Sequence, residues 1–222
     1  MGAAACSAAY PSAPAPADTL TASEAFVRMP AQTLDILTTS QRRDLLDWFK
    51  ADSVKDVRNA MEGTSRLAPP LSDRYLQVQV TPVTRLTIAV LPARKSPLVM
   101  SLYTIGDSLQ AADTEIRFYD PSLRELKRDK FIKTVSTDDF FDFDKAVDPG
   151  AEKLSGKERK KLIALVPFPT VEYTVAPDCR TMTARITVGE FLGEEVMKRI
   201  KPYLRRERTY TWNGSRWQLN KE

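Results

Sequence analysis

The clearest structural pattern in the chain is Tyr75-Leu76-Gln77-Val78-Gln79-Val80, which is followed by Pro82 and residues 85–91. Apolar and polar residues alternate along it, which predicts a half-buried β-strand, a turn at Pro82 and a second strand. Further strands are predicted at 97–105, 115–119, 123–131, 162–166, 171–175 and 181–188. Most connections between them are too short for helical crossovers, so the sheet is predicted to be antiparallel.

Two helices are predicted before the first strand. The capping box Thr21-Ala22-Ser23-Glu24 starts the first helix, and Pro30 ends it. Ser40 is expected to cap the second helix, over 41–51, with Arg42 on its solvent side opposite an apolar stripe of Leu45, Leu46, Trp48 and Phe49. Another helix is predicted over 193–204. The resulting fold class is α+β, with N-terminal helices packed on antiparallel sheet.

The C-terminal end is predicted to be a β-hairpin around Asn213-Gly214, the pair that a type I′ turn prefers. A two-residue loop would pair Trp212 with Ser215, Tyr210 with Trp217 and Arg208 with Leu219. In that register one face carries Tyr210, Trp212, Trp217 and Leu219, and this face is predicted to lie in the core.

Four segments are expected along the chain: a disordered leader remnant (1–20), helices plus an antiparallel meander (21–133), a loop or linker (134–161), and a second α+β unit (162–222). Residues 80–85 are similar to 175–180, and residues 119–126 are similar to 212–219. Two related sheet units produced by duplication are one interpretation of these matches, and shared turn chemistry is the other.

The N-terminal segment is rich in Ala, Ser and Pro and nearly uncharged. Small residues such as Ala3, Ala5 and Ala8 suit a signal-peptidase site, so the segment is read as the remnant of an export signal. This predicts an extracytoplasmic location, in the periplasm or cell envelope. Cys6 is weighed as a lipid acceptor, although no branched apolar residue precedes it. No apolar run is long enough to span a bilayer.

The composition excludes much of the familiar catalytic chemistry. The chain has no histidine and two cysteines, Cys6 and Cys179, so it lacks the usual general base and the usual zinc ligands. Its eight glycines are spread singly, and they form neither a dinucleotide fingerprint nor a phosphate loop. Cys179 is expected to be a structural thiol, because no histidine exists to activate it. No catalytic, cofactor-binding or metal-binding residue is assigned.

Two hypotheses that rest on carboxylate groups stay open, a calcium site and a glycosidase. Asp142, Asp144 and Asp148 offer oxygen ligands for calcium, but the spacing of a helix-loop-helix calcium site is absent. A solvated loop whose phenylalanines (140, 141 and 143) dock on the core is the favoured reading. A glycosidase needs only two carboxyl groups, and acids such as Glu115, Glu172 and Glu190 are candidates without distinguishing context.

The segment 198–208 is rich in lysine and arginine, with Tyr203, Tyr210 and Trp212 nearby. Cations beside aromatic rings are typical of a platform for nucleic acid. The net charge of the whole chain is only +4, however, and a solvated helix face explains the same pattern. Nucleic-acid binding is therefore not expected.

Four motifs support a resemblance to a known family: Phe26-x-x-Met29-Pro30, Arg43-Asp44-Leu45-x-Asp47, Gly63-x-Ser65-x-Leu67 and Ile116-x-Phe118-Tyr119-Asp120. The chain resembles, from about Phe26 onward, an uncharacterised family of exported proteins of unknown function from Bacteroidales-type gut bacteria. The resemblance implies a bacterial origin and an extracytoplasmic location. Its motifs look structural and imply no activity, ligand or catalytic residue.

These observations favour a non-catalytic exported binding or scaffold protein whose partner is a protein or a glycan. The first alternative is a carboxylate-dependent hydrolase such as a glycosidase. The second is a weak nucleic-acid binder that acts through the basic segment 198–208.

Overall fold

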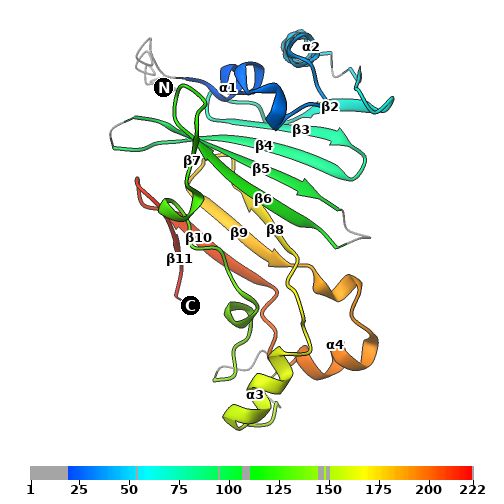
Figure 1. Ribbon diagram of the computed structural model, residues 1–222, viewed down its shortest axis with the longest axis vertical. Helices are drawn as coiled ribbons and strands as arrows, with labels where there is room; N and C mark the ends of the chain where they lie inside the picture. The colour runs from blue at the N-terminus through cyan, green and yellow to red at the C-terminus, as the bar shows by residue number, and fades with distance from the viewer. Residues whose placement is uncertain are drawn as a thin grey trace, which may run out of the picture.

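A seven-stranded antiparallel sheet forms the centre of the computed structural model (Figure 1). Its strands follow one another in sequence order, as β1 (Val57–Arg58), β2 (Thr64–Ala68), β3 (Tyr75–Thr81), β4 (Thr84–Leu91), β5 (Leu98–Ile105), β6 (Asp113–Tyr119) and β7 (Glu125–Leu126). The structure describes residues 20–53, 55–94, 96–106, 111–144, 148 and 151–221, without the side chain of Glu190. Predictions that concern residues 1–19, including the leader and Cys6, lie outside these residues.

A second antiparallel sheet has the order β11-β10-β9-β8. Its strands are β8 (Val171–Val175), β9 (Thr181–Ile186), β10 (Glu207–Trp212) and β11 (Trp217–Leu219). The α-helices of the described chain are α1 (Ala22–Arg28), α2 (Thr39–Lys50), α3 (Gly156–Ile163) and α4 (Glu194–Ile200). The predicted α+β class, with its antiparallel sheet and C-terminal hairpin, is confirmed.

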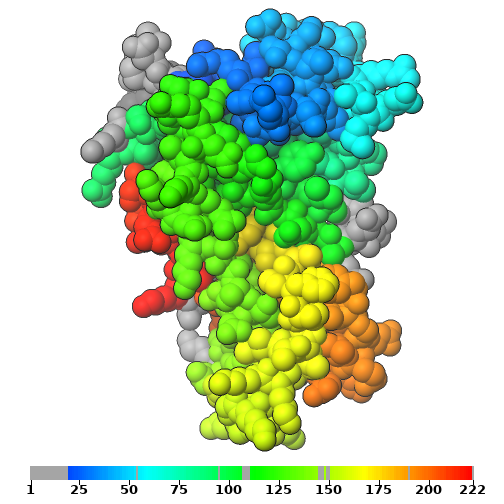
Figure 2. All heavy atoms as spheres, viewed as in Figure 1, coloured from blue at the N-terminus to red at the C-terminus, as the bar shows by residue number. Residues whose placement is uncertain are grey.

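The central sheet is covered on both faces. Helices α1 and α2 lie on one face, and the four-stranded sheet lies on the other (Figure 1). Because side chains alternate along a strand, β4 sends Leu86, Ile88 and Val90 into the helical core and Ala89 and Leu91 into the core between the sheets. The helical layer and the α3–α4 region lie at opposite ends of the molecule (Figure 2).

Capping boxes start three of the helices. Thr21 and Glu24 cap α1, as predicted, and Ser155 and Glu158 cap α3. Helix α2 starts earlier than expected, because Thr38 and Gln41 exchange the two reciprocal bonds of the box and Ser40 falls inside the helix. Helix α4 is shorter than the predicted 193–204 and ends at Ile200.

The expectation that Arg42 faces solvent is wrong. Its side chain is 1% exposed, and its guanidinium donates to four backbone carbonyl oxygens. These belong to Phe26 (3.3 Å), Met29 (2.6 Å), Leu34 (2.6 Å) and Leu37 (2.9 Å). Arg42 thus satisfies carbonyls at the end of α1 and in the loop after it, and it joins that loop to α2.

Several strand predictions are corrected. Strands β1 and β2 were not predicted, and their turn is closed by Asn59, whose Oδ1 accepts from the backbone N–H groups of Met61 and Gly63. The strand predicted at 123–131 shrinks to β7, because Leu123 has a φ of 61° and a 3₁₀ helix follows at Arg128–Lys130. The strand predicted at 162–166 is wrong, since α3 runs to Ile163.

The hairpin register is also corrected. Trp212 pairs with Trp217 and Tyr210 with Leu219, so the loop holds four residues instead of two. Asn213 Oδ1 accepts from the backbone N–H groups of Ser215 and Arg216, and φ is positive at Gly214 but not at Asn213. This asparagine-closed turn replaces the type I′ turn. The shift is two residues, so Tyr210, Trp212 and Trp217 remain in the core as predicted.

The proposed duplication stays a prediction. The similar segments fall on comparable hairpin turns, namely β3–β4 with β8–β9 and β6–β7 with β10–β11. Three strands separate the two turns in the central sheet, and two separate them in the smaller sheet. The segment 134–161 contains the 3₁₀ helix Thr137–Phe140 and the start of α3. In the described residues, no helix has the length and apolar character needed to cross a membrane.

Replacing Arg42 with Met is expected to destabilise the fold by about 3–5 kcal/mol, because four backbone carbonyl groups lose their charged donor and each buried group left unsatisfied costs about 1–3 kcal/mol. The measurement is the change in the free energy of unfolding from denaturant titration. Arg43→Met removes the same charge from an exposed neighbour and is expected to cost less than about 0.5 kcal/mol. Equal effects of the two changes would show that the buried guanidinium does not hold the helical layer.

Candidate functional site

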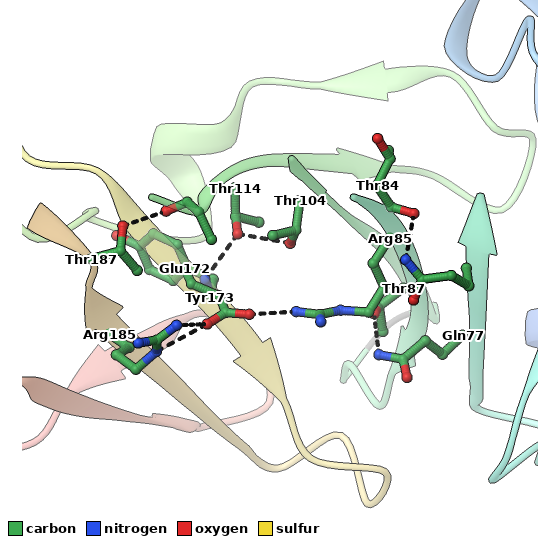
Figure 3. Close-up of polar contacts among 12 residues, drawn as sticks. Gln77, Thr84, Arg85, Thr87, Thr104, Thr114, Glu172, Tyr173, Arg185 and Thr187 are labelled. Atoms are coloured by element: carbon green, nitrogen blue, oxygen red, sulfur yellow. Dashed lines mark hydrogen bonds and ion pairs between the residues drawn. The ribbon is translucent and has the colours of Figure 1, made fainter. Parts of the chain in front are cut away.

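A seam of polar side chains joins the edge strand β8 to the central sheet (Figure 3). On the side of β8 away from β9, the backbone N–H of Val171 donates to Asp113 Oδ1 and that of Tyr173 donates to Thr114 Oγ1, each at 3.0 Å. Thr114 also bonds Thr104 at 2.8 Å. Side chains of β6 thereby satisfy the backbone groups of an edge strand that the inter-sheet contact covers.

Glu172 is the charged centre of this seam. Arg85 of β4 donates to one carboxylate oxygen at 2.7 Å, and Arg185 of β9 donates to the other at 2.8 and 3.0 Å (Figure 3). Burial raises the pKa of Glu172, but the hydrogen bonds and charges of the two arginines outweigh that effect and lower it. A carboxylate held ionised between two guanidinium groups cannot serve as a general acid.

The other two acids considered for hydrolysis are Glu115 and Glu190. Glu115 forms an ion pair with Arg117 at 2.8 Å, and its side chain is 54% exposed. The side chain of Glu190 lies outside the described residues. The seam therefore gives Glu172 a role in joining β4, β8 and β9. Its other carboxylate, Asp113, accepts from the backbone N–H of Val171, which gives it a structural role as well.

The acidic loop does not assemble a metal site in the part of the chain that the structure describes. Asp142 accepts from Arg205 at 2.6 Å, and Asp144 accepts from Arg159 at 3.1 Å. As predicted, Phe140 and Phe141 are buried, and Phe143 packs partly against the same core. Asp148 is described, but its neighbours at 145–147, 149 and 150 are not.

Cys179 is a buried thiol in the turn between β8 and β9. Its Sγ donates to the carbonyl oxygen of Arg74 at 3.3 Å, and burial raises its pKa to about 11. A thiol that is protonated at neutral pH is a poor nucleophile, which agrees with the structural role expected for it.

The basic segment 198–208 does not present a stacking platform. Tyr203, Tyr210 and Trp212 are all buried, and Tyr203 donates to the carbonyl oxygen of Glu152. Arg208 donates to the carbonyl oxygens of Asp139 and Asn220, and Arg205 binds Asp142. These contacts give Arg205 and Arg208 a structural role, and the three aromatic rings belong to the core of the fold.

A pocket of about 360 Å³, which no sequence pattern predicted, lies where three connections meet. We call it the junction pocket, and its walls come from the β4–β5 connection, the β6–β7 turn with the residues after it, and the β10–β11 hairpin. The lining residues are Ala93, Arg94, Ser96, Pro97, Leu98, Asp120, Pro121, Leu126, Phe131, Trp212, Gly214 and Ser215.

Hydrogen bonds join two of the connections that form the junction pocket. Trp212 Nε1 donates to the carbonyl oxygen of Pro92 at 2.7 Å. The backbone N–H of Arg94 donates to the carbonyl oxygen of Gly214 at 3.4 Å. A larger pocket of about 570 Å³ lies beside β11, but polar residues such as Lys133, Asp139 and Asn220 line it. A concave site with apolar walls and few polar groups is typical of ligand binding, so the junction pocket is the candidate functional site.

Glu172→Gln is expected to destabilise the protein by about 1–2 kcal/mol at neutral pH, because a neutral amide makes weaker bonds to the two arginines. The folded-state pKa of Glu172 is lowered, so its contribution is complete above the unfolded pKa, near 4.5, and is lost as the pH falls through the folded value. In denaturant titrations between pH 7 and pH 3, the gap between wild type and variant should narrow as the pH falls. A gap independent of pH would contradict the ion-pair account. Exposed Glu115→Gln is the matched control.

Buried residues dominate the four motifs that suggested a family. Phe26, Leu45, Leu67 and Phe118 are each at most 2% exposed. The motifs therefore consist mainly of core residues, as expected. Of the residues in the four motifs, Asp120 alone lines the junction pocket.

Comparisons with known proteins find a family model and a solved structure that are similar to this chain. A family model described as "Protein of unknown function (DUF3256)" matches residues 17–217. A solved domain of an uncharacterized protein from Porphyromonas gingivalis W83 is similar in structure, with a TM-score of 0.73 and 22% identity over 90% of this chain and 98% of that chain. At that identity the likeness shows the fold alone. No curated protein matches. The chain belongs to the DUF3256 family of proteins of unknown function.

Proposed function

We propose that this protein is a non-catalytic binding protein that acts outside the cytoplasm and holds an apolar group of its ligand or partner in the junction pocket. The observation that carries the proposal is the pocket itself, which joins apolar side chains from three separate connections. Leu98 and Trp212 in its wall are nearly buried, at 6% and 7% exposed. Apolar surface in a concave site offers binding energy when a ligand displaces its water.

The carboxylates and the thiol that could take part in catalysis are bound by other groups of the fold or buried, and this supports binding over catalysis. Glu172 is held between two arginines, Cys179 is buried with a raised pKa, and Asp142 and Asp144 are paired with arginines. A carboxylate-dependent hydrolase remains the alternative from another class. The nucleic-acid alternative has less support, because the rings that it needs are buried.

The proposed location rests on the sequence. The Ala-, Ser- and Pro-rich N-terminal segment resembles the end of an export signal, and the family resemblance implies the same compartment. Fractionation of a bacterial host that expresses the natural gene with a C-terminal tag tests it. We expect the tag in the periplasmic or envelope fraction. Recovery with a cytoplasmic marker enzyme would contradict the proposed location and leave the pocket proposal standing.

Binding of a neutral apolar dye, N-phenyl-1-naphthylamine, tests the pocket. The dye is expected to bind wild type with enhanced fluorescence. Ala93→Phe fills the pocket and should weaken binding by at least about tenfold. Ala60→Phe, at an exposed position in the β1–β2 turn, is the matched control and should bind like wild type.

Circular dichroism confirms that the variants are folded before the comparison is made. Absence of dye binding to folded wild type would overturn the proposed function. Equal binding by wild type and a folded Ala93→Phe variant would place the dye elsewhere, and would also overturn it.

A further inference from the structure

We infer that the junction pocket binds an amphipathic carboxylate, with its apolar body against Trp212 and Phe131 and its carboxylate on Arg94. This inference rests on the proposed function and assigns the chemical class of ligand that the same pocket takes. Three observations carry it: the apolar wall, the charges at the rim, and the volume.

The wall selects an apolar body. Leu98, Leu126, Phe131 and Trp212 contribute hydrocarbon and ring surface to the pocket. The indole N–H of Trp212 is already donated to Pro92, so the ring offers the ligand its apolar surface and not a donor. A ligand group that lies here gains by leaving water and needs no polar partner.

The charges at the rim select an anion. Among the described residues, two charged side chains line the pocket, Arg94 and Asp120. Asp120 is already paired, because its carboxylate accepts from Arg124 at 2.8 Å and from the backbone N–H groups of Ser122 and Arg124. Arg94 is exposed, and its side chain forms no hydrogen bond or ion pair with another described residue. In the described part of the rim, the guanidinium of Arg94 is therefore the positive charge that a ligand can reach.

A guanidinium group beside an apolar pocket matches the chemistry of a carboxylic acid. Its N–H groups can bind both oxygens of one carboxylate, and this geometry is what distinguishes arginine from a simple positive charge. A neutral alcohol of the same shape gains the apolar contacts but lacks the ion pair. An amine of the same shape brings a like charge to Arg94.

The volume limits the size of the ligand. About 360 Å³ lies near the lower end of the range for small-molecule sites. It suits a single acyl chain or a small aromatic molecule, and it is too small for a lipid with two long chains. The same chemistry can come from a free carboxylic acid or from the free C-terminus of a peptide that ends in an apolar residue.

Displacement of N-phenyl-1-naphthylamine provides the test, with decanoate, decanol and decylamine as competitors of one shape and three charges. We expect decanoate to bind about tenfold more tightly than decanol, and decylamine to bind most weakly. Arg94→Gln should abolish the preference for decanoate and leave decanol binding unchanged. Arg199→Gln, on exposed helix α4 at the other end of the molecule, removes an equal charge and should change neither (Figure 2).

A second set of competitors distinguishes a free carboxylic acid from the C-terminus of a peptide as the ligand. It compares decanoate and 3-phenylpropionate with an acetylated peptide that ends in Leu-Phe, carrying either a free or an amidated C-terminus. Preference for the free acids assigns a small-molecule ligand, and preference for the free-carboxyl peptide assigns a protein terminus; either result supports carboxylate recognition.

The outcomes also separate this inference from the proposed function. Dye binding at the pocket with equal affinities for decanoate and decanol would overturn the carboxylate inference alone. An anion preference that survives Arg94→Gln would overturn it as well, because another residue would then hold the charge. Failure of the dye and of every competitor to bind would overturn the proposed function, and the inference with it.

Discussion

The central sheet buries apolar side chains on both of its faces, and this burial requires a layer of structure on each side. A sheet covered on one face can leave polar side chains on the other, but β4 has apolar residues facing both layers. The helices and the smaller sheet must therefore both be held in place. Arg42 fixes the helical layer by binding carbonyl groups of the loop between α1 and α2, and the polar seam fixes the smaller sheet.

The junction pocket follows from the way in which the smaller sheet docks. The seam of Glu172, Thr114 and Asp113 lies along β8, while β10 and β11 lie at the other side of the same sheet. There the hairpin reaches the β4–β5 connection through Trp212 and Pro92. Loops from the two sheets meet at this edge, and their apolar side chains line a concavity instead of closing it. A rigid frame that positions variable connections is a common basis for binding sites.

The sequence predicted those parts of the fold that local patterns determine. Alternation around Leu76, Val78 and Val80 predicted β3, and the Thr21–Glu24 capping box predicted α1. Arg42 was misplaced because its partners are backbone carbonyls, which leave no mark in the sequence pattern. The hairpin loop was misjudged because hydrogen bonds of the Asn213 side chain replaced the turn that Asn-Gly usually forms. The pocket could not be predicted, since the residues of its central bond, Trp212 and Pro92, lie 120 positions apart.

The polar seam should make the smaller sheet and the central sheet open as one cooperative unit, and native-state hydrogen exchange can measure whether they do. If the account is correct, the slowest amides of β4, β5 and β9 open with free energies that agree within about 1 kcal/mol and equal the global free energy of unfolding. Amides of β8, β9 and β10 that exchange through a separate opening several kcal/mol below those of β4 would contradict it. The smaller sheet would then be an independently opening layer, and the junction pocket would not be a preformed site.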